Sequence, residues 1–194
     1  GDLDGDGKLD FVVTNSNLTH SLSVFRNTTA GSFVSFAAKM DLPAVYAPYD
    51  VAIGDMNGDG KPDVVAANNG ANVVSVFKNT STAGNLSFAT RVDLDAGTHP
   101  YRITVADLDA DGKPEIIITN QGSTSALSVL KNSSAVDSIS FENAIILANF
   151  SGPFTVAVGD LDGDAKPDLA AASSGANQII VKGDISTPGV LAFS

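Results

Sequence analysis

Acidic residues recur at alternate positions in four nine-residue segments of this sequence. Each segment has a carboxylate or amide side chain at positions one, three, five and nine, and a Lys at position seven. Oxygen ligands on alternate residues of a glycine-rich loop suit a hard cation such as Ca²⁺, and glycine lets the backbone wrap tightly around an ion. We therefore expect up to four Ca²⁺ ions, one per loop. The predicted ligands, with each Lys contributing its backbone carbonyl, are Asp2, Asp4, Asp6, Lys8 and Asp10; Asp55, Asn57, Asp59, Lys61 and Asp63; Asp107, Asp109, Asp111, Lys113 and Glu115; and Asp160, Asp162, Asp164, Lys166 and Asp168.

Within each loop, the residue at position nine is expected to close the cation site with two oxygens, while the Lys side chain points to solvent. The pattern is like the start of an EF-hand loop, but Ala66 stands where the second loop would need the Glu of position twelve. The alternative is four acidic turns without metal, because Asp, Asn and Gly favour turns. Four or five carboxylates packed together would repel one another strongly without a cation, so cation binding is favoured. Mg²⁺ is less suited than Ca²⁺ to a cage made only of protein oxygens.

The four loops differ in ways that predict unequal affinities. The first has four carboxylates and glycine at both flexible positions. In the second, Asn57 removes one charge, and in the third Glu115 is one methylene longer than Asp. In the fourth, Ala165 stands where the other loops have Gly7, Gly60 and Gly112. If that position is left-handed, Ala costs about 1 kcal/mol. We expect the first loop to bind most tightly.

The charge and composition of the chain fit this reading. The four loops hold 15 of the 22 acidic residues, and the net charge is −11. Acidic residues clustered at four sites indicate cation binding. The sequence has no basic patch that would suggest a nucleic acid partner. No apolar run is long enough to span a membrane. The chain has no Cys, which excludes disulfides and thiolate chemistry. Loops of this kind usually need millimolar extracellular calcium, so we expect a secreted or cell-surface protein.

The loops recur at a fixed period, which identifies the elements that must position them. Their first residues are 53, 52 and 53 positions apart, as in a repeat architecture. Apolar residues alternate before each loop, a continuous apolar run follows it, and a third apolar segment ends in Arg-Asn or Lys-Asn in the first three repeats. A fourth strand is expected to begin at Phe36, Phe88, Phe141 and Phe193.

Four antiparallel strands in each repeat predict an all-β fold of β-propeller blades. A β-solenoid is the competing repeat fold, but its coils are usually shorter, near 20 to 30 residues. We expect one array over residues 1–194, forming part of a larger propeller. Its predicted blades are 1–48 without a first strand, 49–100, 101–153, and 154–194 with an incomplete last strand.

Two motifs carry a family resemblance over the whole chain. Val-Ala-x-Gly-Asp-x-Asp-Gly-Asp-Gly-Lys-Pro-Asp, together with Ser-Val-Phe-Lys-Asn, resembles the FG-GAP/VCBS repeats. These calcium-binding propeller repeats also occur in integrin α chains and in many secreted bacterial proteins. The resemblance implies a propeller, usually seven-bladed, with Ca²⁺ in the loop that joins the first two strands of a blade.

The remaining residues with reactive side chains do not suggest catalysis. His20 and His99 do not recur between repeats and are interpreted as exposed loop residues. Tyr49, Tyr101 and Phe154 each follow Pro at the same repeat position, which is typical of packing. The carboxylate pairs all belong to metal loops, and neither a nucleophile elbow nor a phosphate loop is present. We therefore expect that the chain is not an enzyme.

The function that follows is adhesion, or recognition of a glycan or protein ligand, as the resemblance suggests. A structural spacer that assembles with other copies through open blade edges is a second hypothesis. A non-catalytic scaffold domain of a carbohydrate-active enzyme is a third. The absence of Trp weakens the glycan case, because sugar platforms favour large aromatic faces. The sequence does not identify ligand-binding residues, since recognition by propellers lies in variable loops.

Overall fold

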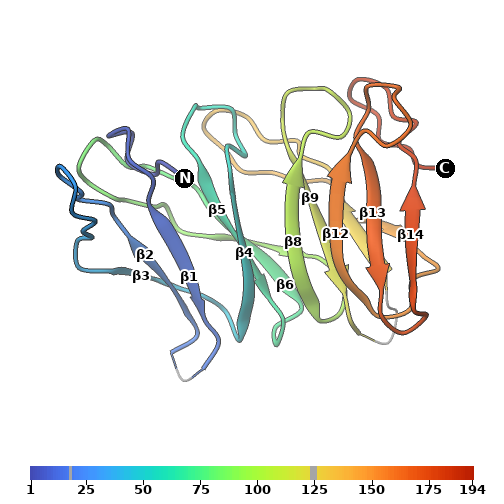
Figure 1. Ribbon diagram of the computed structural model, residues 1–194, viewed down its shortest axis with the longest axis horizontal. Helices are drawn as coiled ribbons and strands as arrows, with labels where there is room; N and C mark the ends of the chain where they lie inside the picture. Colours follow the sequence, from blue (N-terminus) through green and yellow to red (C-terminus); the bar gives the residue numbers. More distant parts are fainter. Residues whose placement is uncertain (18, 123–125) are drawn as a thin grey trace.

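The computed structural model describes residues 1–17, 19–122 and 126–194, and within this part the regular elements are all strands. Fourteen strands form four antiparallel sheets that stand side by side along the molecule (Figure 1). Each sheet comes from one sequence repeat, and the array does not close on itself. The predicted all-β fold of blade-like repeats is therefore confirmed.

We number the four sheets as blades 1 to 4. Blades 2 and 3 have four strands each, and the two end blades have three. The strands are β1 (Phe11–Asn15), β2 (Ser21–Phe25) and β3 (Met40–Pro43) in blade 1; β4 (Pro48–Gly54), β5 (Asp63–Asn68), β6 (Val73–Phe77) and β7 (Val92–Asp95) in blade 2; β8 (Pro100–Ala106), β9 (Glu115–Asn120), β10 (Ala126–Leu130) and β11 (Ile145–Leu147) in blade 3; and β12 (Pro153–Gly159), β13 (Asp168–Ser173) and β14 (Gln178–Lys182) in blade 4.

In blades 2, 3 and 4, the acidic loop is the connection of a β-hairpin. In blade 2, Gly54 at the end of β4 pairs with Asp63 at the start of β5, so the loop lies between two hydrogen-bonded strand ends. Ala106 pairs with Glu115 in the same way, and Gly159 pairs with Asp168. The strand register thus places the first and last loop residues close together, as a wrapped cation site requires.

The hydrophobic core lies between blades. Three clusters of buried side chains fill the three gaps, and alternate residues of a central strand contribute to different gaps. On β5, Val64 and Ala66 pack against blade 1, whereas Val65 and Ala67 pack against blade 3. A strand covered on both faces reads as a continuous apolar run, which is the pattern that follows each loop in the sequence.

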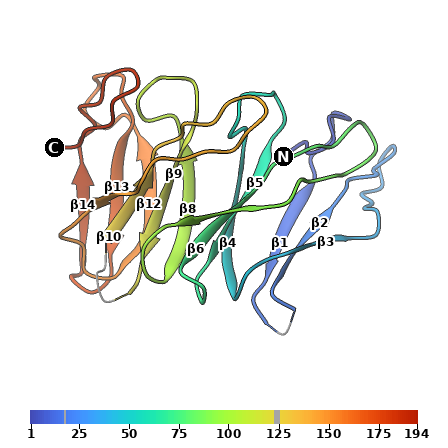
Figure 2. The ribbon, with the colours of Figure 1, turned by 180° about the vertical axis from the view of Figure 1, so that it is seen from behind.

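The expected starts of the fourth strands need correction. Phe36, Phe88, Phe141 and Phe193 each form one isolated bridge, opposite Asn27, Asn79, Asn132 and Asp184. The fourth strands begin four residues after the Phe, at Met40, Val92 and Ile145. A short hairpin occupies the chain after each third strand, so the Phe closes that hairpin, and Phe88, Phe141 and Phe193 pack against the core. The segment after β6 reaches across to blade 1 (Figure 2).

Within the described ranges, no helix has the length and apolar character needed to cross a bilayer.

Candidate metal centres

The carboxylate at position nine holds each loop in place. Oδ2 of Asp63 accepts a hydrogen bond from the Met56 N–H at 2.9 Å, and its Oδ1 accepts one from the Asn79 N–H at 2.7 Å. This residue therefore ties the start of the loop and the end of the third strand to the second strand. Sequence reasoning assigned it to the ion alone and missed this role. The equivalent acceptors and donors are Asp10 with Leu3 and Asn27, Glu115 with Leu108 and Asn132, and Asp168 with Leu161 and Asp184.

Burial makes two of these carboxylates costly to ionise. It raises the pKa of Asp63 to about 6 and that of Glu115 to about 7. The backbone hydrogen bonds oppose the rise, and neighbouring loop carboxylates add to it. In blade 4, by contrast, the hydrogen bond from the Asp184 N–H lowers the pKa of Asp168. The loops of blades 2 and 3 thus contain buried carboxylates whose negative charge a cation would offset.

The carboxylate at position one shapes the loop backbone. Oδ1 of Asp55 accepts from the Gly58 N–H at 2.8 Å, and Oδ2 accepts from the Gly60 N–H at 2.8 Å. Both glycines have positive φ, 74° and 82°. Ala165, which replaces the second of these glycines in the fourth loop, has φ 68°, so the expectation of a left-handed position is confirmed.

The third loop holds a second strained alanine. Ala110 stands where the other loops have Gly5, Gly58 and Gly163, and it has φ 54°. Sequence reasoning missed it, although the Ala-for-Gly exchange is visible when the four loops are aligned.

In the first two loops, the side chain at position three contacts both its own loop and the next blade. Asp4 accepts the Asp6 N–H with Oδ1, and with Oδ2 it accepts the Gly84 N–H of blade 2 at 3.0 Å. Asn57 accepts the Asp59 N–H with Oδ1 and donates from Nδ2 to the Val136 carbonyl of blade 3. The exchange of Asp for Asn therefore matches what the next blade presents, an N–H in one case and a carbonyl in the other.

In the first and third loops, the carboxylate at position three is also close to a basic residue. Arg26 Nη1 lies 3.8 Å from Asp4 Oδ2, and Lys131 Nζ lies 3.5 Å from Asp109 Oδ2. Opposite the neutral Asn57, the corresponding Lys78 donates to the Val136 carbonyl at 2.9 Å instead. In the first and third loops, the basic residue before Asn27 or Asn132 thus compensates the charge at position three.

The Lys at position seven contributes more than a solvated side chain. In all four loops its N–H donates at 2.9 Å to the carboxylate at position five, that of Asp6, Asp59, Asp111 or Asp164. The expectation that these side chains all point to solvent is wrong for Lys61, whose Nζ donates to the Ser81 carbonyl at 2.8 Å. Lys8 Nζ donates to Asp6 at 3.1 Å.

Three of the four loops bring carboxylate oxygens together. In each, one oxygen from each of three side chains lies within 4.8 Å of the others. Among the residues that the structure describes, no such group of three acids forms at the second loop, where Asn57 takes the place of one acid. The groups are Asp2, Asp4 and Asp6; Asp107, Asp109 and Glu115; and Asp160, Asp162 and Asp168.

The third loop gives the clearest test of whether these residues fit a cation. Asp107 Oδ1 and Asp109 Oδ2 are buried and accept no hydrogen bond from the described residues. A buried carboxylate oxygen needs a hydrogen bond or a positive charge. Lys131 offers a charge to Asp109 at 3.5 Å, but Asp107 has no such neighbour among the ion pairs of the described chain. The oxygens therefore fit a hard cation held by Asp107, Asp109 and Glu115.

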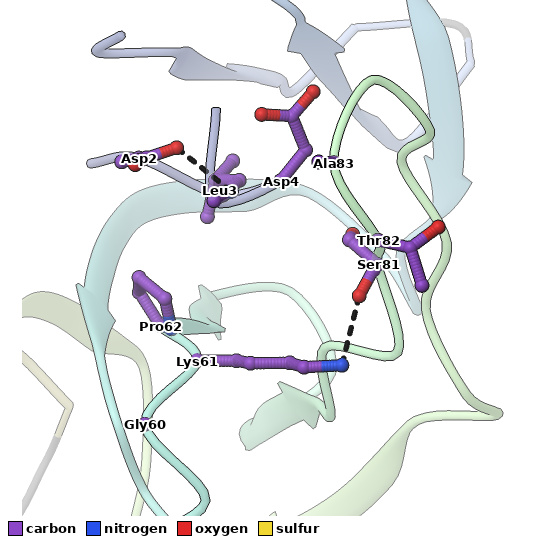
Figure 3. Close-up of a pocket in the computed structure, with 10 residues that line it drawn as sticks. Asp2, Leu3, Asp4, Gly60, Lys61, Pro62, Ser81, Thr82 and Ala83 are labelled. Carbon is purple, nitrogen blue, oxygen red and sulfur yellow. Dashed lines mark hydrogen bonds between the residues drawn. The ribbon is translucent and has the colours of Figure 1, made fainter. Parts of the chain in front are cut away.

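A cavity of about 580 Å³ lies beside the first loop. Asp2 and Asp4 line it on one side, and Lys61 and Ser81 of blade 2 line it on the other (Figure 3). The hydrogen bond from Lys61 to Ser81 closes one wall. The first loop thus borders a solvent-accessible space between two blades.

The two histidines differ in their surroundings. His99 is exposed, as expected. His20 is half-buried: its Nδ1 accepts the Ala47 N–H at 3.2 Å, and its ring lies 4.4 Å from that of Tyr46. The expectation of an exposed loop residue is therefore wrong for His20, which joins blade 1 to the start of blade 2.

The recurrent aromatic residues form a ladder of neighbouring rings across the first strands of blades 2, 3 and 4. The ring centroids of Tyr49 on β4 and Tyr101 on β8 are 4.5 Å apart, and those of Tyr101 and Phe154 on β12 are 5.2 Å apart. Arg102 lies over the rings of Tyr101 and Phe154. The ladder agrees with the packing interpretation.

Comparison with protein families matches these repeats. The FG-GAP-like repeat model matches residues 2–66, 55–118 and 108–171, so each match runs from one acidic loop through the next. A search of curated proteins finds no match. Because the three matches cover most of the chain and coincide with the blades and their loops, the chain belongs to the FG-GAP-like repeat family.

Proposed function

We propose that this propeller-like module binds Ca²⁺ in its loops and acts, without catalysis, in adhesion or in the recognition of a glycan or protein ligand. The observation that carries the proposal is the third loop, where three acidic side chains converge and two buried oxygens accept no hydrogen bond from the residues that the structure describes. Membership of the FG-GAP-like family supports a role as a repeat module. Because such loops usually need millimolar calcium, we also propose that the protein works at the cell surface or outside the cell.

The residues of the loops give the ion a structural task. Bound Ca²⁺ would supply positive charge to the carboxylates of positions one, three, five and nine. The position-nine carboxylate already joins the loop to two strands, and the position-three side chain already contacts the next blade. Neutralising these groups would therefore stabilise both a hairpin and an interface between blades.

Calorimetric titration and thermal unfolding test the metal proposal. Asp107→Asn should weaken Ca²⁺ binding at one site and reduce the rise in melting temperature that Ca²⁺ causes over EDTA. Asp137→Asn is the matched control, because Asp137 is an exposed acid outside the loops. Equal melting temperatures of the unsubstituted protein in Ca²⁺ and in EDTA would refute calcium binding by these loops.

Ligand recognition needs a separate experiment. A screen against glycans and polysaccharides, run in millimolar Ca²⁺ and again in EDTA, should find saturable binding that is lost with the ion. Calcium-dependent unfolding without such binding would leave a protein ligand or a spacer role.

A further inference from the structure

A groove of about 520 Å³ lies between blades 2 and 3, beside the edge strands β7 and β11. Both blades have four strands, so the groove belongs to a complete interface inside the array. Leu94 of blade 2 and Phe141 of blade 3 line it and pack against the buried core. Three acids, Asp93, Asp95 and Glu142, line it as well. We call this space the acidic groove.

The equivalent groove between blades 1 and 2 shows which chemistry fits this place. The chain's own Arg91 reaches across it: Nη1 donates to the Pro43 carbonyl of blade 1 at 3.1 Å, and Nε donates to Asp93 Oδ1 at 2.9 Å. This groove measures only about 240 Å³, less than half of the acidic groove. Its lining residues, each at the repeat position of a residue in the acidic groove, are Leu42, Pro43, Phe77, Phe88, Ala89, Thr90 and Arg91.

Three exchanges distinguish the acidic groove from its equivalent. One removes the arginine that spans the groove, and the other two put acids in place of uncharged residues. The acidic groove is therefore larger and more negative than the one that the chain fills with its own guanidinium. The exchanges are Ala144 for Arg91, Asp95 for Pro43 and Glu142 for Ala89.

Much of this negative charge is left for a cation from outside. Asp93 is paired with Arg91 at 2.9 Å. The Glu142 side chain is 60% exposed, and its Oε1 lies 4.0 Å from Lys131 Nζ. Asp95 takes part in no ion pair among the residues that the structure describes. The acidic groove thus combines apolar walls with carboxylates that can still bind a positive group.

We propose that the acidic groove binds an arginine side chain of a protein ligand. The guanidinium would take the place that Arg91 holds in the neighbouring groove and would meet the carboxylates of Asp95 and Glu142. A guanidinium suits this place because it is planar, weakly hydrated and offers a fork of N–H donors to carboxylates. The methylene groups of the arginine would pack on Leu94 and Phe141.

This inference rests on the proposed role in ligand recognition and names the ligand as an arginine-bearing protein. It does not depend on an ion in the loops. Calcium titration and thermal unfolding test the loops separately, so failure of the calcium proposal and failure of this one give different results. Glycan binding without arginine binding would keep the recognition role and refute this use of the groove.

An NMR titration of the 194-residue chain with a blocked arginine, N-acetyl-arginine methylamide, tests the proposal in millimolar Ca²⁺. We expect saturable shifts of the backbone amide signals of Gly97 and Asn143, which line the groove. The dissociation constant should be about 1 mM, the range of a small fragment. Blocked citrulline, the neutral isostere of arginine, should cause no saturable shift.

Substitutions of the two added acids test the role of charge. Asp95→Asn and Glu142→Gln should each weaken arginine binding by at least about threefold. Asn at position 95 keeps an oxygen that can accept the Gly97 N–H, as Asp95 Oδ1 does at 3.2 Å. Asp137→Asn is the matched control, because it removes an exposed acid elsewhere and should leave the affinity unchanged.

Ala144→Arg tests the comparison between the two grooves. It supplies the side chain that blade 2 already holds at this repeat position, so it should fill the acidic groove and abolish the shifts. Thermal unfolding checks that this variant is folded. Absence of saturable shifts in the unsubstituted protein would overturn the proposal. Equal binding of arginine and citrulline would overturn it too, as would unchanged affinity in both acid variants.

Discussion

At the level of single residues, Asp184 breaks a pattern that the other blades keep. Asn27, Asn79 and Asn132 occupy the same position, and Asn79 Nδ2 donates to the carbonyls of Leu3 and Pro62. Asp184 is buried, and its Oδ2 accepts no hydrogen bond from the described residues. A carboxylate cannot donate a hydrogen bond. In blade 4, the Asp184 carboxylate therefore cannot make the two bonds that the Asn79 side chain donates in blade 2.

We expect Asp184→Asn to stabilise the protein by about 1 to 3 kcal/mol, because the substitution restores the missing donor. The reverse substitution, Asn79→Asp, should destabilise by a similar or larger amount, since it would bury a charge opposite two carbonyls. Urea unfolding of both variants at neutral pH provides the measurement. A loss of stability in Asp184→Asn would show that Oδ2 has a partner that the repeat comparison misses.

Two loop alanines carry backbone strain that glycine would relieve. Ala110 and Ala165 have φ 54° and 68°, and nothing lies within 4 Å of a Cβ at the glycines of the same loop positions. Left-handed backbone costs a residue with a Cβ about 1 kcal/mol relative to glycine. Ala165→Gly should therefore raise the free energy of unfolding by about that amount, and Gly60→Ala should lower it equally. Chemical denaturation in EDTA measures both without interference from metal binding, and equal stabilities for all three proteins would contradict the strain.

The acidic side chains that come together in a loop could be predicted from the sequence because their spacing is local. The nine residues of a loop are consecutive, so their pattern reveals the candidate cation site directly. The Asn79 contact with Leu3 joins residues 76 positions apart, and the Asp4 contact with Gly84 joins residues 80 apart. No local pattern shows such pairs, which is why the second contact of position three escaped prediction.

At the level of elements, each loop and the two strands it joins should respond to pH as a unit. In the absence of metal, burial raises the pKa of Asp63 to about 6 and that of Glu115 to about 7, above the ordinary values of 3.8 and 4.5. The folded protein then binds these protons more tightly than the unfolded chain does. The stabilisation is complete below the ordinary pKa values and is lost as pH rises through about 6 and about 7.

In EDTA we therefore expect the free energy of unfolding to fall between about pH 5 and about pH 8. Asp168, whose pKa is lowered, loses its contribution only in more acidic solution, outside this window. In saturating Ca²⁺ the fall should disappear or reverse, because the ion competes with protons for the carboxylates. Urea titrations at a series of pH values test this, and a stability that rises with pH in EDTA would contradict it.

The strands also show where sequence patterns are sufficient and where they are not. The first three strands of each repeat could be predicted from apolar alternation and from continuous apolar runs. These patterns indicate whether one face or both faces of a strand are buried. The fourth strand was placed too early, because a recurrent Phe resembles the start of a strand even when it closes a hairpin. Phe88 pairs with Asn79 in a single bridge, and β7 begins only at Val92.

At the level of the whole molecule, the four loops are not equally enclosed. The residue after the first acid is buried in loops one to three and exposed in loop four, because the next blade covers only the first three. Asp109 is 2% exposed, and Asp162 is exposed. A cation in an inner loop would therefore stabilise a hairpin and an interface, and one in the fourth loop only a hairpin.

We accordingly expect Asp109→Asn to reduce the calcium-dependent rise in melting temperature more than Asp162→Asn does, by a factor of about two. The two residues hold the same loop position, so each variant controls for the other. Differential scanning calorimetry in Ca²⁺ and in EDTA provides the comparison. A larger loss for Asp162→Asn would show that enclosure by the next blade does not add to the effect of the ion.

The following blade covers each of the first three loops, and this limits how such chains can change during evolution. A blade does not carry everything that its own loop needs, because the Asn and the hairpin that cover the loop come from its successor. The unit that can be copied is therefore one whole repeat, and its loop is covered as long as a repeat of the same kind follows it. Duplication of that unit lengthens the array with every loop still covered. Insertion of an unrelated sheet between two blades would leave the loop before it uncovered.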